Sequence, residues 1–273
     1  MAFSMSSIEA SPLQAPAEDT HATLRLQSLD ACRGTCKGPV FIVASGPSAK
    51  DFPIEEFRHI PMITVNGAIS LFLEAQIAPF FYICTDMGFP VQQPHLYKAA
   101  LKQARNVVIR REGASSARLE GQGNLYLLDK AQTPGLAKRI FRRDHDLVHA
   151  FSMLSRRQST IGFSRNLSKG LVDGRTVAYA ALQLAYHLGF NEVYLVGMDL
   201  NQSLPRFYEG KTGKASPSTL DRHYGNRILP SLQFMARNIV GPAFTVYNLS
   251  QVSRVPSGVI PVLSLDEVRA KLA

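Results

Sequence analysis

The sequence predicts an α/β protein of the Rossmann-like type, with a mostly parallel sheet and helices on both of its faces. Short apolar runs alternate with segments of helical periodicity along most of the chain, which is typical of this class. The clearest unit is GRTVAYAALQLAYHLG, residues 174–189, which is followed at once by the apolar run at residues 191–196. A helix that leads directly into a buried strand is half of a crossover between parallel strands.

The first half of the chain supplies the early elements of this sheet. The apolar run 40–44 is a predicted strand that ends in a Gly-Pro turn, and a short helix is expected at 53–58. A strand at 61–65 stops at the turn pair Asn66-Gly67 and leads into a helix at 68–75. The third strand, 80–84, ends at Thr85-Asp86. A helix at 95–105 and a strand at 106–110 follow.

The second half completes the sheet. Thr176 is placed to cap a helix whose apolar residues recur at helical spacing, and Gly189 supplies its stop. The strand 191–196 ends at Gly197-Met-Asp199. Residues 220–238 are predicted to be helical, and residues 243–249 form the last expected strand.

Length and composition predict one large domain. A chain of 273 residues with 45% apolar content can bury a single core. We expect this domain over residues 38–273, and we expect residues 1–37 to be disordered because they are rich in Ser, Ala and Pro. The part from about 111 to 170 has weak periodicity and is predicted to be a basic helical insertion or a lid.

Three polar strand ends are expected to meet at one edge of the sheet. They are the turn Ser45-Gly46-Pro47-Ser48, the pair Thr85-Asp86 and the segment Gly197–Asp199. In open α/β sheets ligands bind at the carboxyl edge of the strands. The turn lacks the Gly-Lys-Ser/Thr ending of a Walker A loop and the Gly-x-Gly-x-x-Gly dinucleotide pattern. It is therefore either an anion-binding turn at a helix N-terminus or a plain chain reversal.

Few side chains in the sequence suggest a reaction type. Asp86 and Asp199 could each bind a metal, bind ribose hydroxyls or cap a helix, and neither belongs to an Asp-x-Asp pair, so we expect a metal-independent site. The seven histidines include no His-Glu-x-x-His motif. His223, in a polar stretch that enters a helix, is the candidate general base, with an ordinary surface histidine as the alternative. Arg206 follows Asp199 by one loop and could hold a phosphate.

The net charge of +9 is concentrated in one part of the chain. Residues 101–170 contain 14 Lys and Arg against 5 Asp and Glu. Such a segment attracts phosphates on nucleic acid, on anionic lipid or on a substrate, although it could also be only a solvated face. The N-terminus lacks the pattern of a secretory signal, no apolar stretch is long enough to span a bilayer, and three cysteines suggest no disulfide framework.

Several stretches of the chain resemble a known family. GRTVAYAALQLAYHLGFNEVYLVGMDLNQSLPRFYEG, RILPSLQFM and VYNLSQVSRVPSGVIP are similar to the WaaZ family of lipopolysaccharide core biosynthesis proteins, and FIVASGPSAKDFP, ITVNGAISLFL and IAPFFYICTDM have counterparts in the same order. The resemblance covers about residues 38–265. It implies a glycosyltransferase that adds a Kdo (3-deoxy-D-manno-oct-2-ulosonic acid) residue to the lipopolysaccharide inner core.

A more distant resemblance implies roles for single residues. The Gly-Pro-Ser turn, the Asn after the second strand and the strand-Gly-x-Asp end resemble the bacterial sialyltransferases of glycosyltransferase family 42, which use CMP-sialic acid, a chemical analogue of CMP-Kdo. By this resemblance Ser45, Gly46, Pro47, Ser48 and Asn66 bind the nucleotide, with Asp86, Thr176 and Asp199 on the same rim. His223 is the implied base, and Tyr208 holds the leaving phosphate. Asn201 stands where a further tyrosine is expected, so phosphate stabilisation is assigned to Arg206 or Arg254. Arg175, with Arg254, is a candidate for binding the phosphate or the acceptor.

Together these resemblances imply an inverting transfer that needs no metal and no cofactor besides the donor CMP-Kdo. The implied partners are the donor, the lipopolysaccharide core acceptor and an anionic membrane surface, without nucleic acid. The implied location is cytoplasmic and peripheral, at the inner face of the inner membrane. Two alternatives remain open from the sequence: a nucleotide pyrophosphokinase related to the archaeal pterin enzymes, which shares the Gly-Pro-Ser turn, and a basic module that binds nucleic acid or membrane.

Overall fold

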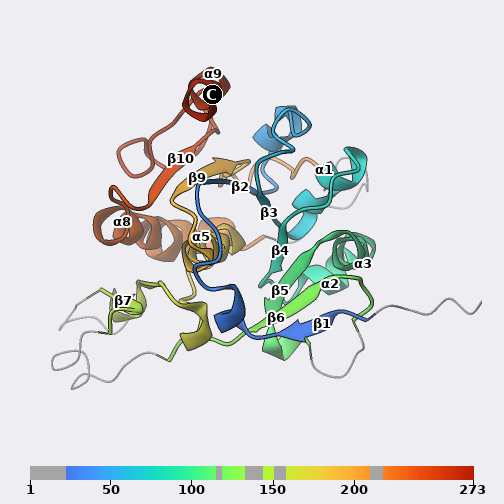
Figure 1. Ribbon diagram of the computed structural model, residues 1–273. Helices are drawn as coiled ribbons and strands as arrows, with labels where there is room; N and C mark the ends of the chain where they lie inside the picture. The colour runs from blue at the N-terminus through green and yellow to red at the C-terminus, as the bar shows by residue number, and fades with distance from the viewer. Residues whose placement is uncertain (1–22, 115–118, 133–143, 151–157, 210–217) are drawn as a thin grey trace, which may run out of the picture.

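The computed structural model describes residues 23–114, 119–132, 144–150, 158–209 and 218–273. Their centre is one sheet of eight strands, in the order β1-β6-β5-β4-β3-β2-β9-β10, in which every neighbouring pair is parallel (Figure 1). The strands are β1 Arg25–Gln27, β2 Pro39–Val43, β3 Met62–Val65, β4 Phe81–Cys84, β5 Asn106–Arg110, β6 Asn124–Leu128, β9 Glu192–Val196 and β10 Thr245–Asn248. The predicted parallel α/β class is confirmed.

Helices cover both faces of this sheet, so its central strands are apolar on both sides. On one face α5 (Val177–Leu188) and α8 (Leu229–Asn238) pack against residues such as Val40 and Ile42. On the other face α1 (Ile69–Glu74), α3 (Pro94–Gln103) and α9 (Leu265–Leu272) pack with Phe41 and Val43. The alternation of Val40, Phe41, Ile42 and Val43 between the two cores explains why this strand reads as an uninterrupted apolar run.

The remaining described elements are short. An antiparallel pair, β7 (Leu147–His149) with β8 (Gly162–Ser164), lies outside the main sheet. The helix α2 is Phe89–Gln92, and α7 is Leu220–His223. The 3-10 turns are η1 Leu29–Cys32, η2 Pro47–Asp51, η3 Asn66–Ala68, η4 Arg111–Gly113, η5 Gln158–Thr160 and η6 Leu167–Lys169, and η7 Tyr224–Ile228 is a π-helical turn between α7 and α8.

The strand order reverses between β2 and β9. From β2 the chain builds the sheet outward through β3, β4 and β5 to β6, and α5 then returns it to the other side of β2 as β9. Such a reversal opens a crevice at the carboxyl ends of the two strands, which is where open α/β sheets bind ligands. The two polar strand ends Ser45–Ser48 and Gly197–Asp199 therefore meet at the switch point of the sheet.

Several predicted boundaries were wrong. Residues 23–37 are not a disordered lead-in: β1 pairs with β6, and Leu29 and Cys32 are buried. Residues 1–22 lie outside the described residues. The short edge strand β1 was missed because it is exposed and its pairing is carried by the backbone. In place of a helix at 53–58, η2 begins at Pro47 and a series of turns follows.

The basic segment also differs from the predicted insertion. Its strand β6 belongs to the main sheet, between β1 and β5, and its other described elements are β7, β8 and 3-10 turns. Residues 115–118, 133–143 and 151–157, which carry several of its basic pairs, lie outside the described residues, as do residues 210–217. The predicted helix over 220–238 is interrupted by η7, and α9 was not predicted.

Candidate active site

The turn after β2 is bound directly to the end of β9. The N–H of Ala44 donates to Val196 O at 2.8 Å, and the N–H of Gly46 donates to Gly197 O at 2.9 Å. Ser48 then makes two bonds to one carboxylate: its N–H donates to Asp199 Oδ2 at 2.8 Å, and its hydroxyl donates to Oδ1. Asp199 is 1% exposed. Its buried carboxylate therefore holds the turn in place through Ser48 and is not exposed at the carboxyl edge of the sheet.

Glycine is required where these two strand ends approach each other. A Cβ on Gly46 would lie 2.4 Å from Gly197 O and 2.6 Å from Asp199 Oδ2. Gly197 has φ +68, a conformation that side-chain-bearing residues rarely adopt. The Ser-Gly-Pro-Ser and Gly-Met-Asp sequences are therefore two halves of one packed unit, with Ser45 to Ser48 half-buried at its surface.

Asn66 and Gly67 follow the next strand, β3, and Gly67 packs against the ring of Tyr208. Asn66 begins η3 with φ 46, and its buried Oδ1 has no hydrogen-bond partner among the described residues. A Cβ on the following Gly67 would lie 2.1 Å from the Tyr208 ring, which is 3% exposed. The loop that carries Tyr208 is bound to the turn, since the N–H of Phe207 donates to Ser45 O at 3.4 Å.

Gly67→Ala is expected to displace Tyr208 and to lower the free energy of unfolding by about 1–3 kcal/mol, the usual cost of overpacking. Adding Tyr208→Ala should return part of this loss, because the smaller side chain makes room for the new methyl group. Urea denaturation of the two single variants and the double variant measures the coupling. Gly258→Ala, where nothing lies within 4 Å of the added Cβ, is the matched control. Additive effects of the two substitutions would contradict this packing.

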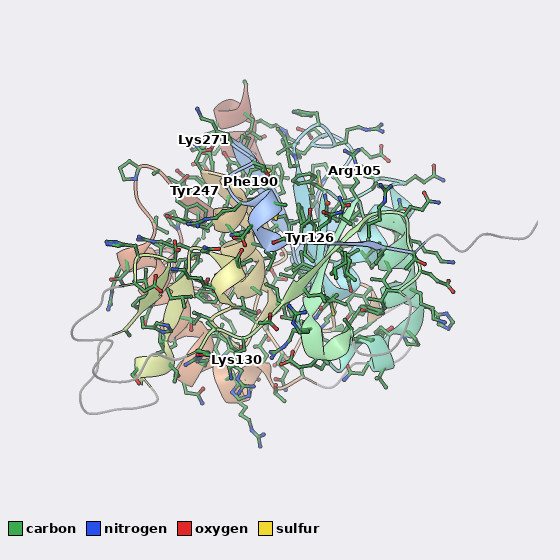
Figure 2. All side chains as sticks on the ribbon, turned by 60° about the horizontal axis from the view of Figure 1, so that its bottom comes forward. Arg105, Tyr126, Lys130, Phe190, Tyr247 and Lys271 are labelled. Atoms are coloured by element: carbon green, nitrogen blue, oxygen red, sulfur yellow. The ribbon has the colours of Figure 1, made fainter. Side chains whose placement is uncertain are left out.

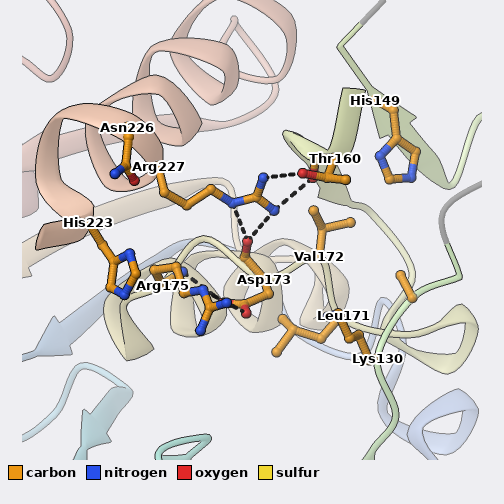
Figure 3. Close-up of a pocket in the computed structure, with 11 residues that line it drawn as sticks. Lys130, His149, Thr160, Leu171, Val172, Asp173, Arg175, His223, Asn226 and Arg227 are labelled. Atoms are coloured by element: carbon orange, nitrogen blue, oxygen red, sulfur yellow. Dashed lines mark hydrogen bonds and ion pairs between the residues drawn. The ribbon is translucent and has the colours of Figure 1, made fainter. Parts of the chain in front are cut away.

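The predicted base, His223, lines a pocket of about 230 Å³ (Figure 3). Its walls come from separate parts of the chain: Lys130 after β6, His149 on β7, the segment before α5, and α7 with η7. Figure 3 shows His223 and Arg175 at one end of the pocket and His149 at the other. The pocket thus brings His223 together with Arg175.

Two arginines of the pocket are held by defined contacts. The N–H of Arg175 donates to Asp173 Oδ1 at 2.8 Å, and Arg175 Nε lies 3.5 Å from Asp173 Oδ2, which fixes the residue with φ 63. Arg227 donates to the carbonyl oxygens of Asp173 at 2.7 and 2.9 Å and of Thr160 at 2.8 Å. These bonds tie the start of α5 to η7 across the pocket.

Arg254 connects this pocket to the switch point. Its N–H donates to Asp199 O at 2.9 Å. Its guanidinium forms an ion pair with the Asp221 carboxylate and lies 4.0 Å from the centre of the Tyr224 ring, whose hydroxyl donates back to Arg254 O. Arg254 therefore fixes α7, and with it His223, beside the buried Asp199.

Three other predicted site residues, Thr176, Arg206 and Asp86, are not among the residues that line the pocket. Thr176 occupies the N-cap position of α5 with extended backbone but makes no side-chain capping bond. Arg206 forms an ion pair with Glu209, with Nη1 and Oε1 2.7 Å apart. Asp86 is exposed, accepts the N–H of Gly88 at 2.9 Å, and follows β4, two strands and about 10 Å from β2. The structure thus gives Asp86 a local turn role and does not place it beside the Ser45–Ser48 turn.

His187, unlike His223, is a buried histidine with a structural role. His187 is 1% exposed, lies 2.9 Å from Leu29 O through Nε2, and accepts the N–H of Leu167 at Nδ1. Burial lowers its pKa, so it is held neutral. Both of its nitrogens serve the fold, which leaves His223 and His149 as the pocket imidazoles.

Sequence reasoning missed Lys130, Asp173 and Arg227. Arg227 follows His223 at the helical i, i+4 spacing, and this signal could have paired them. Lys130 carries no such signal, because it reaches the pocket only through the fold. Within the described residues no group of three His, Cys, Asp or Glu side chains is placed to hold a metal ion, and none of the described helices is long and apolar enough to cross a membrane.

Comparison with known proteins identifies similar chains. The family model described as 3-deoxy-D-manno-octulosonic acid transferase WaaZ matches residues 26–266. A probable 3-deoxy-manno-octulosonic acid transferase of Escherichia coli K12 is 29% identical over 245 residues, which cover 85% of this chain and 84% of that protein. Its counterpart from Salmonella typhimurium LT2 is 26% identical over 242 residues, which cover 85% and 88%.

Two solved structures are similar at lower levels. The MAf glycosyltransferase of Magnetospirillum magneticum AMB-1 has a TM-score of 0.47 and 16% identity, over 93% of this chain and 38% of that one. The sialyltransferase CstII of Campylobacter jejuni, solved with the substrate analogue CMP-3FNeuAc, has a TM-score of 0.39 and 13% identity, over 82% of this chain and 84% of that one.

Proposed function

The chain belongs to the 3-deoxy-D-manno-octulosonic acid transferase WaaZ family of glycosyltransferases of lipopolysaccharide biosynthesis, and from this membership we propose that it transfers Kdo from CMP-Kdo to the lipopolysaccharide inner core. The observation that carries the proposal is the link made by Arg254 between the Asp199 strand end and the helix that bears His223. It sets the Ser45–Ser48 turn at the switch point beside a pocket with an imidazole, as a two-substrate transfer requires.

In this proposal the cytidine phosphate lies over the Ser45–Ser48 turn and Asn66. The half-buried turn offers small residues that a phosphate can approach closely, and the unpartnered Asn66 Oδ1 is an acceptor for a ligand hydroxyl or amino group. Both strand ends are fixed by hydrogen bonds before any ligand binds, so little ordering is needed at that step.

In the proposed reaction His223 is the general base. Its imidazole takes the proton of an acceptor hydroxyl while that oxygen attacks C2 of Kdo, and the bond from C2 to the phosphate oxygen breaks. CMP leaves with the electron pair, and in-line attack inverts the anomeric centre. Tyr208 and Arg206 are the groups proposed to stabilise the negative charge that grows on the departing phosphate.

The direct test is incubation of the full chain with CMP-Kdo and a truncated core lipopolysaccharide. CMP release and a mass increase of the acceptor by one Kdo residue are expected together. CMP-sialic acid in a parallel reaction tests whether another 2-keto sugar is accepted. CMP release without a change in acceptor mass would indicate hydrolysis and would contradict the transfer.

We expect this transfer to continue in EDTA. The leaving group is a phosphate monoester of cytidine, so no metal ion is needed to bridge a diphosphate, and side chains carry the charge stabilisation proposed above. Initial rates with and without excess EDTA should agree within about twofold. Removal of a catalytic metal would cost several kcal/mol of transition-state stabilisation and would lower the rate far more than that. Loss of activity that magnesium restores would favour the nucleotide pyrophosphokinase alternative.

We further propose that the protein contacts the inner membrane through its basic segment, residues 101–170, which contain 14 Lys and Arg against 5 Asp and Glu. Each exposed Lys or Arg near an anionic surface contributes about 1 kcal/mol, and this attraction is screened by salt. A wash of isolated membranes in high salt should therefore release the protein, measured by immunoblot of pellet and supernatant. Protein that remains in the pellet would show that attachment is not electrostatic.

A further inference from the structure

The pocket beside His223 is rich in positive charge. Among the described residues that line it are three cations, Lys130, Arg175 and Arg227, and one carboxylate, Asp173. The single carboxylate is already bound to Arg175. A concave site with this balance favours an anionic ligand, because field lines are concentrated between low-dielectric walls.

The backbone around the pocket adds to the same potential. The twelve-residue helix α5 begins next to Arg175, and Thr176 gives its first turn no side-chain acceptor. The partial positive charge of the helix N-terminus thus adds to that of the cations. On the other wall the π-helical turn η7 directly follows His223 and carries both Asn226 and Arg227 into the pocket lining. π-helical turns occur frequently at functional sites.

The volume limits what can bind. At about 230 Å³ the pocket is smaller than a typical site for a whole drug-sized ligand. It can hold one sugar unit or its charged group, while the rest of a large saccharide stays outside. The donor nucleotide is proposed to lie at the switch point, on the other side of the contact that Arg254 makes with Asp199.

We propose that this pocket is an anion subsite for the acceptor saccharide, in which Arg175 and Lys130 bind a carboxylate or phosphate group and so place the neighbouring hydroxyl at His223. The inference rests on the proposed Kdo transfer and adds a specificity to it. An acceptor that lacks the charged group should bind weakly, whatever its other sugars are.

The test compares Arg175→Gln and Lys130→Gln with the unaltered protein in steady-state kinetics. The KM for the acceptor is expected to rise about tenfold in each variant, the loss of one charge-assisted contact, while the KM for CMP-Kdo changes by less than about twofold. Arg105→Gln is the matched control. Arg105 is exposed and directly precedes β5, so it lies at the amino-terminal ends of the strands, whereas Lys130 follows β6 at the carboxyl ends; Figure 2 shows the two residues far apart. An unchanged acceptor KM, or a rise confined to the donor KM, would overturn the proposal.

Two treated acceptors identify the charged group. One has its carboxyl groups reduced and the other has its phosphates removed. One of the treatments is expected to raise the acceptor KM of the unaltered protein to that of Arg175→Gln. The group removed by that treatment is the group that Arg175 binds. If neither treatment has an effect, the subsite is not an anion site.

A binding measurement separates this proposal from the transfer itself. Calorimetric titration with free Kdo and with a hexose phosphate, in the absence of donor, should show binding of at least one probe that weakens about tenfold in Arg175→Gln. Such binding without any Kdo transfer would reject the proposed function and keep the subsite. Transfer with no difference in probe binding between the two proteins would reject the subsite and keep the function.

Discussion

Replacing His223 by alanine is expected to lower kcat for Kdo transfer by about 10²–10⁴-fold, the usual contribution of a positioned general base. The reason is geometric: α7 is held beside Asp199 through Arg254, and His223 lines the pocket that is proposed to bind the acceptor sugar. The KM for CMP-Kdo should change little, because the donor is proposed to bind at the switch point. CMP release under saturating donor and acceptor measures kcat.

The pH profile gives a second readout of the same role. A base that must be deprotonated to act produces a fall of kcat/KM toward low pH, and this fall should be absent from the residual activity of His223→Ala. His149 lines the same pocket, so His149→Ala is the comparison variant. If the large loss follows His149 in place of His223, the base role moves to His149. Full turnover by His223→Ala would remove it from the chemistry.

The strands of the sheet could be predicted because each central strand is buried on both faces. An uninterrupted run such as VFIV, closed by a Gly-Pro turn, is typical of a strand buried on both faces, and the polar residues that follow it mark the carboxyl edge. The edge strand β1 could not be predicted, because all three of its residues are exposed and only backbone hydrogen bonds define it. The boundary expected at residue 37 was wrong for that reason.

The two halves of the site differ in the same way. The switch-point turn is local, so Ser45–Ser48 and Gly197–Asp199 could be recognised from short stretches of sequence. The pocket is not local: Lys130, Thr160, Asp173 and Arg227 come from separate segments, and only the return of α5 across the sheet brings them together. Of the pocket residues, Arg175 and His223 were candidates from the sequence, and their partners were found only in the structure.

Asp199 is the residue whose expected role changes most. From the sequence it was one polar residue on a ligand-binding rim. In the structure it is buried, and both of its carboxylate oxygens accept hydrogen bonds from Ser48. A buried carboxylate bonded in this way supports the shape of the turn, and any effect on the nucleotide passes through Ser45–Ser48.

Asp199→Ala is therefore expected to damage both the fold and donor binding. Removing the carboxylate leaves two donors of Ser48 without their acceptor, and hydrogen bonds to charged groups contribute about 1.5–3 kcal/mol each, so we expect a loss of about 3 kcal/mol in the free energy of unfolding. Asp199→Asn keeps the shape and one acceptor, so its loss should be roughly half as large. Urea denaturation measures both.

Binding of CMP separates the two consequences. If Asp199 acts by shaping the turn, the affinity for CMP should fall in the same order as the stability, with Asp199→Ala weaker than Asp199→Asn. The Gly46→Ala variant, whose Cβ would collide with Gly197 O and the Asp199 carboxylate, should reproduce the binding loss while Asp199 is intact. Asp51→Ala, exposed at the end of η2, is the matched control. An Asp199→Ala protein of full stability that cannot bind CMP would show the carboxylate to be a direct ligand contact, because turn shape and nucleotide binding would then be independent.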